Sequence, residues 1–302
     1  MNLKDIEDYS KKIKGKIKFD YDISNLNWFN IGGKVEVFFK PESLQELIDF
    51  LKIYKKRDKI FLLGAGSNIL FTDKKFKGVV IKLGKIFSNI SKLNNETIVA
   101  GSSALDKSVS DFAKENSIGG LEFLSCIPGS IGGGIRMNSG CFEKEFKDVL
   151  VSIQLINSDG VVSTIPASKI GFKYRSTNLD QNFIFLSATL KGYKQEKSLI
   201  ENEVANLINK KKISQPSKIK TGGSTFKNPK EQTSKKVWEL IKESVPINTK
   251  IGDAQISEMH CNFFVNTNKA KFEDMKNLIN LVQNKVKNKT GISIEPEIVV
   301  VE

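Results

Sequence analysis

The segment GGSTFKNP, residues 222–229, holds a serine where the chain could do chemistry. Ser224 follows two glycines and precedes a threonine, an aromatic residue, a lysine and an asparagine. A nucleophilic serine needs a base beside it, most often a histidine. The chain has one histidine, His260, and its position before an apolar run favours a structural or ligand-binding group over a catalytic base. If Ser224 acts, it acts without a Ser-His-Asp triad.

A first glycine-rich segment, LLGAGSNILF at 62–71, directly follows an apolar run. The residues that could meet a ligand are Gly64, Ala65, Gly66, Ser67 and Asn68. Successive backbone N–H groups in such a loop can point at a pyrophosphate. The segment departs from the Rossmann dinucleotide fingerprint, because Ile69 stands where the third glycine belongs. A plain glycine turn is an equally good interpretation of this segment alone.

A second segment, IPGSIGGGIRMNSG at 127–140, is denser in glycine. Glycine in a regular element costs about 0.5–1 kcal/mol relative to alanine, and close approach of the backbone to a ligand would justify that cost. The apolar residues among the glycines argue against a flexible surface loop. The candidate ligand-binding residues are Ile127, Pro128, Gly129, Ser130, Gly132, Gly133 and Asn138.

Two shorter segments carry charged side chains. FKYRST (172–177) contains Tyr174 and Arg175, and the final EPEIVVV contains Glu295 and Glu297. The chain has only three arginines among its 47 basic residues, and planar bidentate hydrogen bonding is a property that lysine lacks. The i, i+2 spacing of the glutamates predicts that both lie on one face of a strand. A solvated arginine and an exposed strand edge are the alternatives.

Composition and charge describe a globular protein. Of the 302 residues, 39% are hydrophobic and 27% charged, which is ordinary for a soluble domain, and no apolar run reaches the ~20 residues that span a bilayer. The N-terminus lacks the apolar core of a signal peptide, so we expect a cytoplasmic protein without a membrane partner. The net charge of +13 raises a nucleic-acid-binding alternative, but the lysines are scattered. Three unpaired cysteines and one histidine predict neither a disulfide framework nor a metal site.

Hydrophobic periodicity predicts mixed helices and strands. An amphipathic helix at 41–56, with Ser43 and Glu46 in capping-box spacing, lies between apolar runs at 35–39 and 60–63. Further strands are predicted at 79–83, 97–100, 151–156, 161–165, 183–189, 262–266 and the C-terminus, and further helices at 104–116, 199–211, 233–244 and 272–288. The turn NSDG at 157–160 joins two of these strands as a hairpin. The order of elements indicates an α/β start followed by α+β structure.

Six segments occur in an order and spacing typical of one family: NWFNIGG, GAGSNILF, IPGSIGGGIRMNSG, KYRST, TGGSTFKNP and EPEI. From about residue 20 to 300 the chain resembles the UDP-N-acetylenolpyruvoylglucosamine reductases of peptidoglycan precursor synthesis. The resemblance implies non-covalent FAD in the α+β fold of the vanillyl-alcohol oxidase-like (PCMH-type) flavoproteins, with two α/β subdomains and a C-terminal α+β substrate domain. It implies boundaries at 1–75 with the last strand 293–302, at 76–193 and at 194–292. Both glycine-rich segments and Arg175 would bind FAD.

In the family reaction, NADPH reduces the flavin, which then reduces the enolpyruvyl group of UDP-N-acetylglucosamine enolpyruvate to give UDP-N-acetylmuramate. By resemblance Arg175 stabilises charge on the substrate carboxylate, and Glu297 is its hydrogen-bonded partner or an acid. Ser224 donates the proton that completes the lactyl ether, a task that needs positioning but no histidine. Substrate contacts are implied for Tyr174, Lys227, Asn228, His260 and Lys212.

Some residues depart from the family pattern. Val299 stands two residues after Glu297, where the family often has arginine. The segment 176–183 is short, as in the subgroup that lacks an extra tyrosine-bearing loop. The main alternative is another FAD-dependent oxidoreductase or oxidase of the same fold, and a basic nucleic-acid-binding protein is the alternative from another class. No obligate protein partner is implied.

Overall fold

The computed structural model describes residues 3–54, 59–157, 159–216 and 219–302. The chain divides into two compact units. Unit 1 comprises Met1–Phe19, Glu36–Ala65 and Lys77–Lys210, and unit 2 comprises Asp20–Val35, Gly66–Phe76 and Lys211–Glu302. The three-domain division drawn from the sequence stays a prediction.

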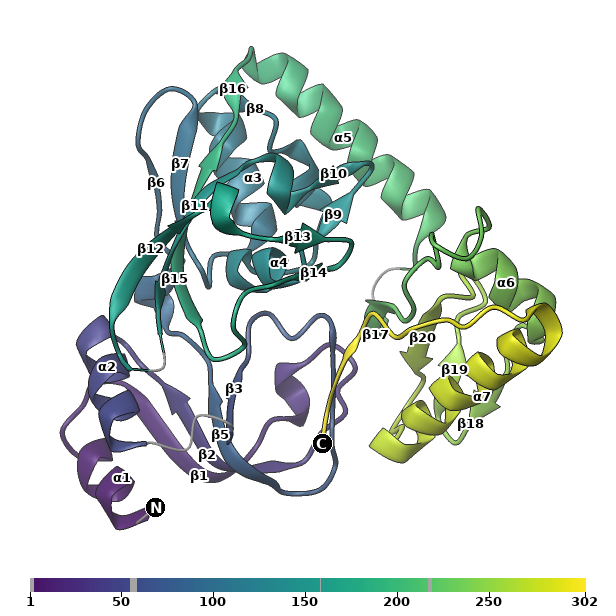
Figure 1. Cartoon of the computed structure of the whole chain (residues 1–302), viewed down its shortest axis with the longest axis horizontal. Helices are drawn as coiled ribbons and strands as arrows, with labels where there is room; N and C mark the ends of the chain where they lie inside the picture. The colour runs from purple at the N-terminus through teal and green to yellow at the C-terminus, as the bar shows by residue number, and fades with distance from the viewer. Residues whose placement is uncertain (1–2, 55–58, 158, 217–218) are drawn as a thin grey trace. The chain divides into compact units, whose positions relative to one another are not determined.

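A four-stranded sheet in the order β1-β2-β5-β3 is formed mainly by residues of unit 1 (Figure 1). Its strands are β1 (Lys16–Asp22), β2 (Lys34–Lys40), β5 (Phe76–Ile81) and β3 (Ile60–Leu62), and β3 runs parallel to β5. Helices α1 (Leu3–Ser10) and α2 (Leu44–Ile53) bury Ile6, Leu47 and Phe50 in the core of this layer. The first glycine-rich segment therefore begins where the parallel strand β3 ends, at an edge that commonly binds ligands.

An antiparallel sheet in the order β12-β11-β15-β7-β6 forms the second layer of unit 1. Its strands are β6 (Ile90–Lys92), β7 (Thr97–Gly101), β11 (Leu150–Ile156), β12 (Val162–Pro166) and β15 (Ile184–Lys191). Helices α3 (Asp106–Glu115) and α4 (Ile131–Arg136) lie beside it and share its buried core. Residue 158, in the predicted hairpin turn, lies outside the described residues.

Short antiparallel pairs extend this unit and include the hairpins that matter for the site. They are β8 (Ile118–Gly119) with β16 (Tyr193–Lys194), β9 (Gly140–Cys141) with β10 (Lys144–Glu145), and β13 (Phe172–Lys173) with β14 (Ser176–Thr177). Helix α5 (Lys197–Ser214) follows, and the boundary with unit 2 falls within it.

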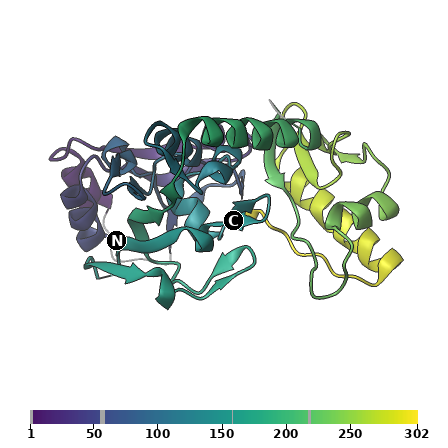
Figure 2. The ribbon, with the colours of Figure 1, turned by 90° about the horizontal axis from the view of Figure 1, so that it is seen from above.

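Unit 2 is built on a four-stranded antiparallel sheet in the order β17-β20-β19-β18. The strands are β17 (Lys220–Ser224), β18 (Lys250–Ile251), β19 (Ala254–Ile256) and β20 (Phe263–Asn266). Helix α7 (Phe272–Thr290) packs on β18, β19 and helix α6 (Val237–Ser244), and both helices are seen from above in Figure 2. The last strand, β21 (Val299–Val301), pairs in parallel with β4 (Ile69–Phe71) of the same unit.

The predicted helices and strands are present among the described residues, and three details are corrected. The end of the predicted helix 41–56, at residues 55–56, lies outside the described residues. Ser43 does cap α2 by accepting a hydrogen bond from the Glu46 N–H, but the Glu46 carboxylate accepts from the N–H groups of Glu42 and Lys14, so only half of the predicted capping box forms. Segment 295–297 is not in a strand, because β21 begins at Val299. The second glycine-rich segment contains a short helix, α4, which was not among the helices predicted from the sequence.

Within the described ranges, no helix is long and apolar enough to cross a membrane. The same ranges hold no group of three or more histidine, cysteine, aspartate or glutamate side chains placed to bind a metal ion.

Candidate functional site

The first glycine-rich segment leaves β3 and passes from unit 1 to unit 2 after Ala65. In unit 1, the Gly64 carbonyl oxygen accepts a 2.5 Å hydrogen bond from Nζ of Lys82. A Cβ atom on Gly64 would lie 2.7 Å from Oγ of Ser130, which belongs to the second glycine-rich segment. An alanine at position 64 would therefore displace the Ser130 hydroxyl at the point where the two segments approach each other. Burial and the nearby charge of Lys40 lower the pKa of Lys82, so an anion beside it would be favourable.

The second glycine-rich segment is held against residues 102–106 of unit 1. Three backbone hydrogen bonds join them, from Asp106 N to Gly129 O, from Ile131 N to Ala104 O and from Gly132 N to Ser102 O. A Cβ atom on Gly133 would lie 3.6 Å from Oγ of Ser130, so bare backbone flanks this hydroxyl on both sides. Bare backbone, one hydroxyl and one ammonium group are suited to the phosphates of a dinucleotide, and these residues fit such a cofactor.

A buried acidic group lies directly under this segment. Asp106 is fully buried, and a Cβ atom on Gly129 would lie 2.6 Å from its Oδ2 atom. Its carboxylate oxygens and the hydroxyls of Ser102 and Ser110 have no hydrogen-bond partner among the described residues. Burial raises the pKa of Asp106 well above its ordinary value, which favours the neutral acid. Sequence reasoning missed this residue, because an aspartate in the first turn of a helix is unremarkable.

Arg175 and Tyr174 form the tip of the hairpin between β13 and β14. Arg175 has a φ of 56°, a left-handed conformation that is uncommon outside glycine and asparagine and marks a strained position. Its Nη1 atom donates to the Asn138 carbonyl at 3.4 Å and its Nη2 atom to the Gly140 carbonyl at 3.2 Å. The guanidinium carbon is 5.1 Å from the centre of the Tyr174 ring. The structure thus brings Arg175 and Asn138, both named from the sequence, into direct contact.

Asn138 and Glu145 surround this arginine. Asn138 is fully buried and has a φ of 41°. Its Nδ2 atom donates to Oε2 of Glu145 at 3.0 Å and to the Lys173 carbonyl at 3.1 Å, and its Oδ1 atom accepts from the Lys147 N–H at 3.1 Å. Both side-chain donors of Asn138 are therefore used within the protein. The Oε1 atom of Glu145 lies 3.6 Å from Nη1 of Arg175. Sequence reasoning missed Glu145, whose segment carries no motif.

Ser224 is the last residue of β17 in unit 2, opposite Phe263 of β20. The strand pairing is irregular between Thr221 and Ser224, where Gly223 has a φ of 79°. Ser224 is partly buried, and no described residue makes a hydrogen bond to its hydroxyl, whereas the neighbouring Thr225 is buried and accepts a bond from the Phe264 N–H at 3.3 Å. The Thr225 hydroxyl therefore takes part in the hydrogen bonds of the fold, whereas the adjacent Ser224 hydroxyl is available to a ligand.

Glu297 lies opposite Thr225, the residue after Ser224, in unit 2. The Glu297 N–H donates to the Thr225 carbonyl at 2.8 Å, and the Lys227 N–H donates to the Glu295 carbonyl at 2.9 Å. Segment 295–297 therefore runs antiparallel beside 225–227. Asn68 holds the same segment, because its Nδ2 atom donates to the Glu297 carbonyl at 3.0 Å. Three regions that are far apart in the sequence meet here.

His260 comes just before β20, the strand that pairs with Ser224. Its Nδ1 atom accepts a 3.1 Å hydrogen bond from the Asn262 N–H, which leaves the ring proton on Nε2. Its ring centre is 4.9 Å from that of Phe263. Burial lowers the pKa of His260, so the ring is neutral near pH 7 and suited to hydrogen bonding.

The remaining predicted substrate contacts lie in unit 2 and differ in their surroundings. Oδ1 of Asn228 accepts a 2.9 Å hydrogen bond from the Val237 N–H at the start of α6, so this side chain has a structural task. Nζ of Lys227 lies 3.6 Å from the exposed Glu295 carboxylate. Lys212 is exposed in the last turn of α5.

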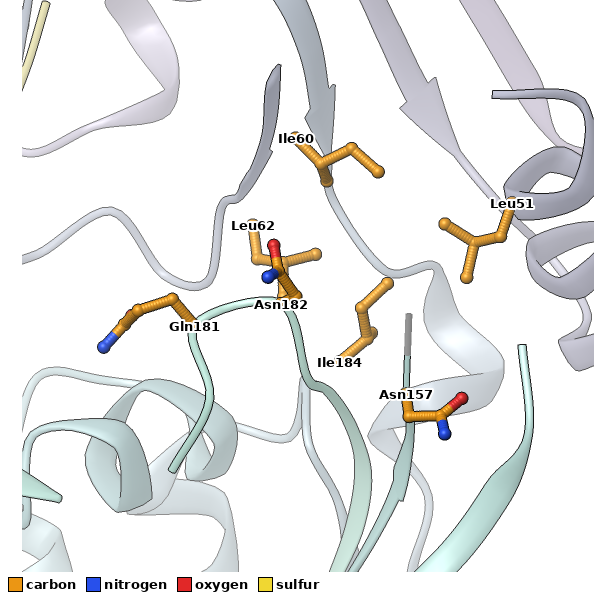
Figure 3. Close-up of a pocket in the computed structure, with 7 residues that line it drawn as sticks. All are labelled: Leu51, Ile60, Leu62, Asn157, Gln181, Asn182 and Ile184. Carbon is orange, nitrogen blue, oxygen red and sulfur yellow. The ribbon is translucent and has the colours of Figure 1, made fainter. Parts of the chain in front are cut away.

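Two cavities lie away from these residues. Figure 3 shows the first, in unit 1, where Leu51, Ile60, Leu62 and Ile184 point toward a common space. Its volume of about 10 Å³ is at most that of one water molecule. The second is an open depression of about 730 Å³ in unit 2, and none of the predicted site residues lines it. Neither cavity marks the site.

Comparisons with known proteins agree across the whole chain. The family model described as "UDP-N-acetylenolpyruvoylglucosamine reductase, C-terminal domain" matches residues 215–301, and the one described as "FAD binding domain" matches residues 35–165. A UDP-N-acetylenolpyruvoylglucosamine reductase from Pelagibacter ubique (strain HTCC1062) is 60% identical over 298 residues, 99% of each chain. One from Rickettsia rickettsii (strain Sheila Smith) is 44% identical over 286 residues, 95% of this chain and 96% of the other. The crystal structure of the Thermus caldophilus enzyme matches with a TM-score of 0.81 and 27% identity, and covers 96% of this chain and 100% of the other.

Proposed function

Because the chain belongs to the UDP-N-acetylenolpyruvoylglucosamine reductase family, we propose that Arg175, Ser224 and Glu297 are its catalytic residues. The chain is an FAD-binding oxidoreductase with an α+β fold of the vanillyl-alcohol oxidase-like (PCMH-type) class, and it serves peptidoglycan precursor synthesis. Hydride transfer from NADPH to the substrate is the chemistry that FAD would supply when bound. The substrate in this proposal is UDP-N-acetylglucosamine enolpyruvate.

Ser224 gives its proton to the substrate carbon beside the one that accepts hydride. The C=C bond of the enolpyruvyl group is then saturated, NADPH is oxidised, and the product is the lactyl ether. A hydroxyl that the fold does not use and that lies at the end of a strand has the freedom to donate. Solvent returns the proton to the serine. Ser224 acts here as a proton donor and not as a nucleophile, because no acyl group is transferred. It therefore needs no histidine base.

Arg175 binds the substrate carboxylate and stabilises the negative charge that develops on it as hydride arrives. Glu297 lies opposite the residue after Ser224 in the paired segments 225–227 and 295–297, and in this proposal it cooperates as a hydrogen-bonded partner or as an acid. The backbone pairing that sets Glu297 opposite Thr225, the residue after Ser224, is the observation that carries this proposal. Tyr174, Lys227, Asn228, His260 and Lys212 are proposed substrate contacts.

FAD is assigned to the two glycine-rich segments. Gly64, Ser130 and Gly133 offer bare backbone and a hydroxyl to its phosphates, and Lys82 offers a cation. Arg175 would lie at the same cofactor. The proposal also includes the three-domain division at residues 1–75 with 293–302, 76–193 and 194–292. We further propose that the protein is cytoplasmic and that it is active without an obligate protein partner.

The test is anaerobic mixing of the purified flavoprotein with NADPH and then with UDP-N-acetylglucosamine enolpyruvate. We expect the flavin absorbance to bleach with NADPH and to return with the substrate, and UDP-N-acetylmuramate to form in equal amount. A protein that bleaches but is reoxidised only by oxygen would contradict the proposed substrate.

A further inference from the structure

The Arg175 guanidinium is surrounded by groups of unit 1 that fix its position. Its guanidinium donates to the carbonyls of Asn138 and Gly140, and the Glu145 carboxylate lies 3.6 Å away. The exposed fractions of the Arg175 and Glu145 side chains are 19% and 17%, so salt screens this ion pair less than a surface pair. An arginine on a strained two-residue turn would otherwise have many orientations.

Gly140 is what lets Glu145 reach the arginine. These two residues are paired across β9 and β10, and a Cβ atom on Gly140 would lie 2.7 Å from Cγ of Glu145. The missing side chain gives the glutamate its path. The Gly140 carbonyl is also one of the two acceptors of Arg175, so one glycine serves both sides of the pair.

Asn138 links this pair to the hairpin that carries Arg175. Its Nδ2 atom donates both to Glu145 and to the carbonyl of Lys173, two residues before Arg175. Burial alone would raise the pKa of Glu145, but the bonds from Lys147 and Asn138 and the charge of Arg175 lower it. Glu145 is therefore an anion at neutral pH, fixed in place by a buried amide.

We propose that Glu145 and Asn138 are positioning residues for Arg175, which hold its guanidinium plane in the orientation that the enolpyruvyl carboxylate requires. This rests on the proposed function of Arg175. The device has a distinctive consequence. Removal of the Glu145 charge loosens the guanidinium, so catalysis weakens. It also makes the electrostatic potential around Arg175 more positive, so affinity for an anionic substrate does not weaken.

The experiment compares Glu145→Gln with Glu143→Gln, which makes the same charge change at an exposed neighbouring glutamate. For Glu145→Gln we expect reoxidation by the enolpyruvyl substrate to slow by about 10- to 100-fold, the scale of a misplaced catalytic group. Its FAD content, its reduction by NADPH and the substrate Kd should stay near those of the wild type or, for Kd, fall. Glu143→Gln should match the wild type in every step.

A double-mutant cycle with Arg175→Lys separates the possible failures. If Glu145 acts through Arg175, Glu145→Gln should slow the Arg175→Lys protein by less than 3-fold, because coupled residues are not additive. Normal reoxidation by Arg175→Lys itself would overturn the proposed role of Arg175. A slow Arg175→Lys protein beside a Glu145→Gln protein that is normal, or that fails only because it loses FAD, would overturn the positioning role alone.

Discussion

Replacement of Ser224 by alanine should separate the two halves of the reaction. Ser224 has no task while NADPH reduces the flavoprotein, so the flavin absorbance should bleach at close to the wild-type rate. Its task begins when the substrate carbon needs a proton. We therefore expect slow recovery of the absorbance on addition of the enolpyruvyl substrate, with substrate affinity little changed, because the lost interaction acts in the transition state.

The size of the effect follows from the surroundings of the hydroxyl. No described residue hydrogen-bonds to it, so its removal should change the free energy of unfolding by no more than about 0.5 kcal/mol. General acid catalysis contributes roughly 10²–10⁴-fold to a rate. The expected signature is thus a loss of two to four orders of magnitude in one half-reaction, in a protein of wild-type stability.

Thr225→Val is the matched control, because it removes the neighbouring hydroxyl, which the fold uses. It leaves the buried Phe264 N–H without its side-chain acceptor, at a cost of about 1–3 kcal/mol in unfolding free energy, while both half-reactions should remain within a few-fold of the wild type. Urea unfolding and anaerobic stopped-flow absorbance measure the two effects. If Ser224→Ala is reoxidised as fast as the wild type, or if bleaching by NADPH is the step that fails, Ser224 is not the proton donor.

Four further outcomes are expected. Gly64→Ala should weaken FAD binding, because its Cβ would lie 2.7 Å from Oγ of Ser130, and Ser130→Ala in the same chain should restore part of the affinity in a fluorescence titration. Lys82→Gln should raise the Kd for FAD about tenfold, or ~1.4 kcal/mol, and reduce its salt dependence; an unchanged Kd would remove Lys82 from the phosphate site. Arg136→Lys should lower the free energy of unfolding in urea by about 2 kcal/mol, because one ammonium cannot replace bonds to three carbonyls. Burial raises the folded-state pKa of Asp106, so the contribution of Asp106 to stability is greatest below its ordinary pKa of 3.8 and is lost as the pH rises through the folded-state value; the loss of Tm from pH 4 to 8 should be smaller in Asp106→Asn.

The elements and the motifs could be predicted from the sequence because their signals are local. Helix α2 is amphipathic and starts at a capping serine, and β11 and β15 are short apolar runs. The apolar residues among the glycines of 127–140 argued against a flexible surface loop, although the helix α4 within this segment was missed. Glycines give a poor helical signal, and this helix exists because its backbone packs closely on neighbouring segments.

The features of the site that could not be predicted from the sequence depend on tertiary contacts. Glu145 stands in no motif, and its contact with Arg175 depends on a bare glycine across a hairpin. Asp106 is part of an ordinary helix start, and only the packing of Gly129 over it makes it a buried acid. The strand expected through Glu297 was wrong, because residues 295–297 make only an isolated bridge with 225–227 around Pro296, and the strand begins at Val299. Each of these depends on a partner far away in the chain.

The proposed catalytic residues share one means of support, which is the backbone of their neighbours. Two carbonyls hold Arg175, a ladder of backbone bonds aligns Glu297 with the residue after Ser224, and bare glycines shape the cofactor segments. Backbone groups do not depend on side-chain identity, so a lysine- and asparagine-rich composition can change around them without moving the site. The side chains that cannot vary freely are then the few that bind backbone themselves, Asn68 and Asn138 foremost. Substitution of either should disturb the orientation of a catalytic residue before it disturbs the fold as a whole.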